Sequence, residues 1–173
     1  MSLQRNRTLV RDLMQVGVTT CSPDALIWDV ARMMLEKELD AVIVLDQDEG
    51  HALGVVSQRE LAQAYLQEGK DGLRAQDIMH EGEPQIPPDI PITAAVQMML
   101  DQDVRTFFLV HHAGGVTYPA AYISYHHILR YLAARGEGDL QGLGIEAARK
   151  NPIESFMERR DAARRRNIAL REE

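Results

Sequence analysis

The sequence predicts a mixed α and β protein made of two similar halves that pack together with pseudo-twofold symmetry. Three observations predict this fold class: the chain repeats itself, each copy alternates helical and extended patterns, and one copy is too short to bury its own sheet. The chain has 173 residues, of which 45% are hydrophobic, and this is enough for one compact module built from both halves.

A shift of 65 residues brings many positions of the chain into register without a gap. For example, Asp-Leu-Met at 12–14 falls on Asp-Ile-Met at 77–79. The second copy gains two residues in its turn, so Ser57 meets Ser124 at a shift of 67. The predicted organisation is a first repeat at 8–71, a second repeat at 72–135, and a glycine-rich hinge with a basic helix at 136–173.

Each copy is expected to run in the order β-α-β-β-α. In the first copy, apolar residues at i, i+3, i+4 and i+7 predict a helix from about 24 to 38. The β-branched run at 41–45 predicts a buried strand, and 53–57 predicts the return strand after a polar turn. The second helix is expected at 58–69, ending at a glycine. The second copy predicts the corresponding elements at 92–103, 106–110, 120–124 and 125–136.

The composition predicts a protein of a reducing compartment. The single cysteine, Cys21, excludes an internal disulfide framework and a cysteine cluster for zinc. No apolar run approaches the ~20 residues that span a bilayer, and the N-terminal stretch lacks the apolar segment of a signal peptide. We therefore expect a cytoplasmic location and no membrane association.

The charge is unevenly distributed along the chain. Residues 149–173 carry eight Lys or Arg against five Asp or Glu, whereas the whole chain has a net charge of -7. An acidic body does not match a general binder of phosphate backbones, and only the tail could act as one. Asn151, Pro152 and Glu154 predict the start of a tail helix. We expect this helix to pack on its own module or on a second copy, with a partner protein and nucleic acid as alternatives.

A series of short motifs occurs twice in the same order. The first copy contains "DLM", "VTTCSPDALIWDVARMMLEKELDAVIVLD" and "ALGVVSQREL", and the second contains "DIM", "PQIPPDIPITAAVQMMLDQDVRTFFLV" and "AAYISYHHIL". This arrangement resembles the tandem CBS-domain module, named after the regulatory domain of cystathionine β-synthase. The resemblance implies a regulatory module, as in energy sensing, that binds AMP, ADP, ATP or S-adenosylmethionine between the repeats. It also implies a homodimer formed through the helices, no catalytic activity and no obligatory cofactor.

The resemblance implies a first cleft with chemistry suited to a nucleotide. It would join the Gly-to-acid stretch of one repeat to the extended segment and the helix-to-strand corner of the other. Glu60 would accept hydrogen bonds from ribose hydroxyls, and Arg105 would face a phosphate. The backbone around Gln85 and Ile86 would read the adenine edge. The complete predicted set is Ser57, Arg59, Glu60, Gln85, Ile86, Val104 and Arg105.

A second cleft is implied, but its residues depart from the pattern of the family. His127 stands at the position of the ribose-binding acid, and Asp40 stands at the corner equivalent to Arg105, where an anion repels a phosphate. Ala121 also replaces Gly54. We expect this cleft to be degenerate, either empty or holding a ligand without phosphate. Its predicted set is Thr20, Ala25, Leu39, Asp40, Ser124 and His127.

Two simpler interpretations of these residues remain open. Ser57 and Glu60 also match a capping box, in which the serine and the glutamate satisfy the first amides of a helix. Both roles are compatible, since a helix N-terminus attracts anions. The histidine pairs at 111–112 and 126–127 suggest a metal site, but adjacent side chains point in different directions and chelate poorly. We therefore expect no metal.

The function expected from the sequence is that of a sensor whose ligand changes how the two halves, or two copies, lie against each other. The alternative is a ligand-free dimeric scaffold whose basic C-terminal helix docks a partner protein or nucleic acid. An enzyme is not expected, because the sequence shows no nucleophile-base pair, metal cluster or phosphate-cradling glycine loop.

Overall fold

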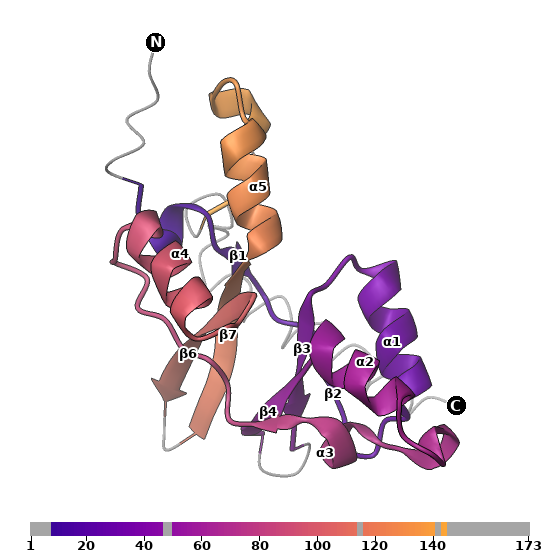
Figure 1. Cartoon of the computed structure of the whole chain (residues 1–173). Helices are drawn as coiled ribbons and strands as arrows, with labels where there is room; N and C mark the ends of the chain where they lie inside the picture. The colour runs from indigo at the N-terminus through magenta and orange to yellow at the C-terminus, as the bar shows by residue number, and fades with distance from the viewer. Residues whose placement is uncertain (1–7, 47–49, 114–115, 141–142, 145–173) are drawn as a thin grey trace, which may run out of the picture.

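The computed structural model describes residues 8–46, 50–113, 116–140 and 143–144, which form a mixed α and β fold of two similar halves (Figure 1). The first half contains β2 (Thr20–Cys21), α1 (Ile27–Glu36), β3 (Ala41–Leu45), β4 (Ala52–Ser57) and α2 (Gln58–Tyr65). The second half contains α4 (Ile92–Asp101), β6 (Thr106–Ala113), β7 (Val116–Ser124) and α5 (Tyr125–Ala133). The predicted tail helix lies outside the described residues.

Each half completes its sheet with a strand from the segment that precedes the other repeat. The two sheets have the orders β2-β3-β4-β5 and β1-β7-β6. The short strand β1 (Gln15–Val16) pairs antiparallel with β7, placing Val16 opposite Ala121. Its counterpart β5 (His80–Glu81) pairs antiparallel with β4, placing Glu81 opposite Gly54. The two exchanged strands join the halves covalently and by backbone hydrogen bonds.

The connecting segments pack in the same exchanged way. The 3-10 turn η2 (Val10–Asp12) contributes Val10 to the core of the second half, and the two residues after the turn join Met99 and Phe107 in that core. Helix α3 (Ala75–Ile78), which follows a second 3-10 turn η3 (Lys70–Gly72), lies against the core of the first half. A third 3-10 turn is η4 (Glu137–Leu140). The repeated Asp-Leu-Met and Asp-Ile-Met motifs therefore anchor each repeat to the opposite half.

The helices follow the apolar spacing that predicts them. In α1 the buried residues are Ile27, Val30 and Met34, and in α4 they are Ile92, Ala95 and Met99. These six residues occupy equivalent positions in the two copies. A smaller cluster of Ile43, Val55 and Phe108 joins the two sheets directly. The symmetry of the sequence is thus reproduced in the two cores.

The predicted helix boundaries were too wide. Helix α1 begins at Ile27 because Leu26 is extended and forms a bridge with Arg74. Helix α2 ends at Tyr65 and not near Gly69, since the next two amides bond to carbonyls three residues back. Helix α4 ends at Asp101, two residues before Asp103, whose φ of 53° leaves the helical region.

Strands β6 and β7 are longer than the sequence predicts. Their pairing continues beyond 106–110 and 120–124 until Ala113 meets Val116. The register shifts between Leu109 and Val110, and Pro119 lies opposite this irregularity. Proline cannot donate to a regular ladder, so a bulge lets the two strands continue past it.

Candidate functional site

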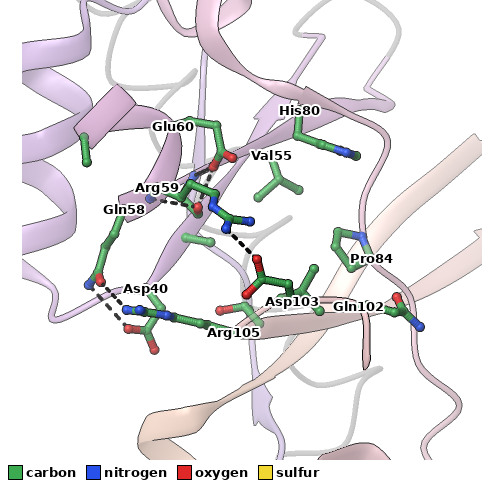
Figure 2. Close-up of a pocket in the computed structure, with 15 residues that line it drawn as sticks. Asp40, Val55, Gln58, Arg59, Glu60, His80, Pro84, Gln102, Asp103 and Arg105 are labelled. Carbon is green, nitrogen blue, oxygen red and sulfur yellow. Dashed lines mark hydrogen bonds and ion pairs between the residues drawn. The ribbon is translucent and has the colours of Figure 1, made fainter. Parts of the chain in front are cut away.

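A cleft of about 480 Å³ lies between the two halves, beside the N-terminus of α2 and the corner between α4 and β6 (Figure 2). We call it the Glu60 cleft. The first half lines it with Asp40, Ala41, Val55, Ser57, Gln58, Arg59, Glu60 and Ala62. The second half and its preceding segment line it with His80, Pro84, Gln102, Asp103, Val104, Arg105 and Thr106. The structure therefore brings together five of the seven residues predicted for the first cleft.

Ser57 and Glu60 form the capping box at the start of α2. The Arg59 amide donates to Ser57 Oγ over 3.1 Å, and the Ser57 amide donates to Glu60 Oε2 over 2.8 Å. The Ser57 hydroxyl donates to the same carboxylate oxygen. Among the described residues, Oε1 of Glu60 accepts no hydrogen bond. The capping interpretation is confirmed, and this half-buried carboxylate, which lines the cleft, has one oxygen outside the capping box.

An ion pair crosses the Glu60 cleft from one repeat to the other. The guanidinium of Arg59, at the start of α2, contacts Asp103 Oδ2 at the corner before β6, as the dashed line in Figure 2 shows. Both side chains are more than half exposed, so this pair adds little to stability. It does neutralise Arg59 within the cleft.

Arg105 is held more loosely than Arg59. Its Nη1 donates to Gln58 Oε1 over 3.4 Å, and Gln58 Nε2 donates to Asp40 Oδ1 over a further 3.4 Å (Figure 2). Hydrogen bonds of this length are weak. No carboxylate of the described residues forms an ion pair with Arg105. Arg105 is therefore a cation in the cleft wall that an incoming anion can engage.

Gln85 and Ile86 do not line the cleft, although the sequence placed them in it. Ile86 is 3% exposed and belongs to the core of the second half. Its amide donates to the Phe108 carbonyl, and the Phe108 amide donates to the Pro84 carbonyl. The extended segment thus pairs with β6, and Gln85 turns outward to hydrogen-bond Glu83. The segment presents Pro84 to the cleft instead.

Sequence reasoning also missed Asp103 and His80. The sequence did contain a signal for Asp103, because an acidic residue, Glu38, stands at the equivalent position of the first repeat, at a shift of 65. In the structure both residues have a φ of 53°. An acidic residue therefore recurs at the left-handed position that ends the first helix of each repeat. His80 carried no such signal, since its position follows from the pairing of β5 with β4.

Within the part of the chain that the structure describes, the cleft wall contains one buried polar group without a partner. Thr106 is 6% exposed, and its hydroxyl has no hydrogen-bond partner among the described residues. A buried hydroxyl without a partner costs about 1–3 kcal/mol. Native proteins tolerate few such groups, and each one calls for an explanation, which a role at a functional site would supply.

A second cleft, of about 380 Å³, lies between the corresponding elements, the start of α5 and the corner between α1 and β3, and we call it the His127 cleft. Of its predicted residues, Leu39, Asp40, Ser124 and His127 line it. Thr20 does not, because it lies in β2 opposite Ile43, and Ala25 packs against the core of the first half. Residues not predicted there are Gln15, Gly17, Thr19, Lys37, Glu38, Tyr122, His126 and Arg130. Asp40 lines both clefts.

His127 plays the part in α5 that Glu60 plays in α2. It is 2% exposed, and its Nδ1 accepts a hydrogen bond from the Ser124 amide over 3.0 Å. Burial, and secondarily the nearby His126 and Arg130, lower the pKa of His127 to about 4, while Asp40 opposes the shift. The ring is therefore neutral at pH 7, with its proton on Nε2 because Nδ1 is the acceptor. Burial and Asp40 raise the pKa of Tyr122.

Metal binding, thiol chemistry and membrane spanning are three further properties on which the described residues bear. There, no group of three His, Cys, Asp or Glu side chains could hold a metal ion. Cys21 is buried, and burial raises the pKa of its thiol to about 11, which disfavours the reactive thiolate. No helix among the described residues is long and apolar enough to cross a membrane.

Known proteins share both the repeat and the fold. The sequence model of the CBS domain matches residues 10–67 and 75–134, which is more than half of the chain. Protein MK0525 of Methanopyrus kandleri is 25% identical over 107 residues, which cover 61% of this chain and 54% of that protein. The chain thus aligns with about half the length of this curated relative.

Two solved structures show the same arrangement of two halves. The CBS domain pair of protein MJ0100, in complex with 5′-methylthioadenosine and S-adenosyl-L-methionine, is 16% identical with a TM-score of 0.63, covering 75% of this chain and 98% of that one. Protein ATU1752 of Agrobacterium tumefaciens is 22% identical with a TM-score of 0.62, covering 75% and 96%. With two family matches in tandem and the fold of a CBS domain pair, this chain belongs to the CBS domain family.

Proposed function

We propose that this protein is a regulatory module that binds an adenosine-containing ligand in the Glu60 cleft. The observation that carries the proposal is Arg105, a cation without a carboxylate partner among the described residues, facing the capped start of α2 across the cleft. A ligand anion would meet Arg105, and a ribose diol would meet the available oxygen of Glu60. The ligand-bearing CBS domain pair of MJ0100 supports the adenosine class.

A regulatory role is supported by the origin of the cleft residues, which come from both repeats. Glu60 belongs to the first repeat and Arg105 to the second, so a ligand that contacts both ties the halves together. Such a ligand favours one relative arrangement of the halves in proportion to its difference in affinity for the two arrangements. A partner that recognises this arrangement would then respond to the ligand. The rival proposal is a ligand-free scaffold, in which the clefts bind nothing.

Thermal unfolding in the presence of AMP, ADP, ATP, S-adenosylmethionine or a cyclic dinucleotide separates the two proposals. A ligand at ~100 times its dissociation constant stabilises the folded state by ~2.7 kcal/mol, a visible shift of the midpoint. We expect at least one adenosyl compound to raise the midpoint. If every compound leaves it unchanged, the scaffold is favoured.

Two variants assign the shift to the Glu60 cleft. Arg105→Ala and Glu60→Gln should each reduce the ligand-induced shift, and Glu60→Gln should do so with little loss of basal stability, because glutamine also completes a capping box. The matched control is Arg130→Ala, which removes a cation from the His127 cleft. A shift lost in Arg130→Ala and kept in Arg105→Ala would assign the ligand to the other cleft.

We also propose that the module forms a homodimer through its helices. Leu35 on α1 and its repeat equivalent Leu100 on α4 are 81% and 62% exposed. Tyr65 and its equivalent Leu132 are exposed as well. Because apolar residues recur at the same positions of both halves, a second copy related by a twofold axis can cover both patches at once.

Static light scattering tests this dimer. Leu35→Glu and Leu100→Glu should lower the molar mass of the particle towards that of a single chain, since a buried charge without a partner disfavours the interface. The control Gln76→Glu adds the same charge on the exposed side of α3. A monomeric native protein, or an unchanged mass in both leucine variants, would contradict the helical interface.

A further inference from the structure

The charged groups that line the Glu60 cleft are mostly negative. Three carboxylates line it, from Asp40, Glu60 and Asp103, against two guanidinium groups, from Arg59 and Arg105. Asp103 already neutralises Arg59. Of the cations that line this cleft in the described part of the chain, Arg105 is left to receive a ligand anion.

We propose that the Glu60 cleft selects adenosyl ligands whose 5′ substituent is uncharged or a single phosphate, and discriminates against the triphosphate. This inference rests on the proposed function, because it concerns which adenosyl ligand the same cleft accepts. Asp103 is the residue that sets the selectivity, through its pairing with Arg59. Figure 2 shows the Asp103 carboxylate turned towards Arg59, which lies at the start of α2.

Electrostatics gives the direction of the selectivity. A first phosphate can bind Arg105, which then gives up its weak 3.4 Å hydrogen bond to Gln58. A second or third phosphate must either share Arg105 or displace Asp103 from Arg59. If the phosphates share Arg105, the neighbouring carboxylates repel the added negative charge. If a phosphate displaces Asp103, the Asp103 carboxylate becomes an unpaired anion beside the ligand. Each outcome weakens binding of the longer phosphate chain.

The backbone holds Asp103 at this corner. Its φ of 53° is a left-handed conformation that Asp and Asn tolerate better than most residues. Asp103→Asn therefore removes the charge while preserving the shape and the backbone. The equivalent residue Glu38 has the same φ and lines the His127 cleft, so Glu38→Gln is a matched control with the same change of charge.

Isothermal titration calorimetry on the full chain, with AMP, ATP and 5′-methylthioadenosine in buffer containing EDTA, tests the inference. We expect AMP and 5′-methylthioadenosine to bind at least about tenfold more tightly than ATP. Asp103→Asn should bring the AMP and ATP affinities closer by about fivefold or more, because it frees Arg59. Arg59→Gln should separate them further, since it leaves Asp103 unpaired, and Glu38→Gln should change neither. Added salt should reduce the discrimination.

The outcomes separate this inference from the proposed function. If AMP and 5′-methylthioadenosine bind but ATP binds equally well or better, the selectivity is wrong and the adenosyl site stands. If the native protein discriminates but Asp103→Asn and Arg59→Gln leave the ratio unchanged, Asp103 does not set the selectivity. If no adenosyl compound binds, the proposed function itself is overturned. Melting temperatures measured without ligand verify that Asp103→Asn and Arg59→Gln are folded.

Discussion

Replacing Gly54 with alanine is expected to lower the free energy of unfolding by about 3 kcal/mol. A Cβ on residue 54 would lie 2.3 Å from the carbonyl oxygen of His80 and 3.1 Å from the sulfur of Met79. The obstacle is backbone, in the strand β5 that crosses from the second repeat to pair with β4. That strand must move away, and it carries His80 and leads to Pro84 in the cleft wall. Urea unfolding measures the loss.

Gly72→Ala is the control for this substitution. A Cβ at Gly72 meets nothing within 4 Å, and the change should alter the free energy of unfolding by less than about 0.5 kcal/mol. The equivalent of Gly54 in the second repeat is Ala121, which tolerates a methyl group opposite Val16 in β1. A loss below about 1 kcal/mol for Gly54→Ala would show that β5 yields easily and does not hold the two repeats together.

His127 should make the protein lose stability as the pH falls from about 6.5 to about 4. The folded-state pKa is lowered to about 4, whereas an unfolded histidine titrates near 6.5. Between these values the unfolded chain binds more protons than the folded one, so the free energy of unfolding decreases with falling pH. The full difference corresponds to roughly 3 kcal/mol, and none of it is lost above pH 7.

Urea unfolding at pH 7, 5.5 and 4 of the native protein and of His127→Gln isolates this contribution. Glutamine can accept the hydrogen bond of the Ser124 amide but does not titrate, so the native protein should lose more stability than the variant as the pH falls. His111→Gln, at an exposed position in β6, should follow the native protein closely. Parallel pH profiles for the native protein and His127→Gln would mean that His127 is accessible to protons without unfolding.

Features that depend on neighbouring residues could be predicted from the sequence. The apolar spacing of Ile27, Val30 and Met34 needed only the period of a helix, and all three are buried. The cap of Ser57 and Glu60 depends on hydrogen bonds within four residues, so its sequence pattern was sufficient. The internal repeat supplied the remaining information, because it required the second copy to have the same order of elements as the first.

The part of the site that could not be predicted depends on register between distant segments. The extended segment before α4 borders the cleft at Pro84, but Ile86 faces the core because its amide donates to the Phe108 carbonyl. The Arg59–Asp103 pair joins residues 44 positions apart, and local patterns do not specify such a contact. Asp40 was assigned to one cleft, yet its corner borders both.

By itself, the sequence determined the two-repeat architecture, the buried faces of the first helix in each repeat and the asymmetry between Glu60 and His127. These features follow from residue type and from spacing along the chain, and the sequence contains both. The tertiary structure decided that β1 and β5 are exchanged between halves, that Asp103 neutralises Arg59 and that Arg105 is left for a ligand. The physical reason is that pairing and charge compensation depend on distances across the fold, and the packing of both repeats sets those distances.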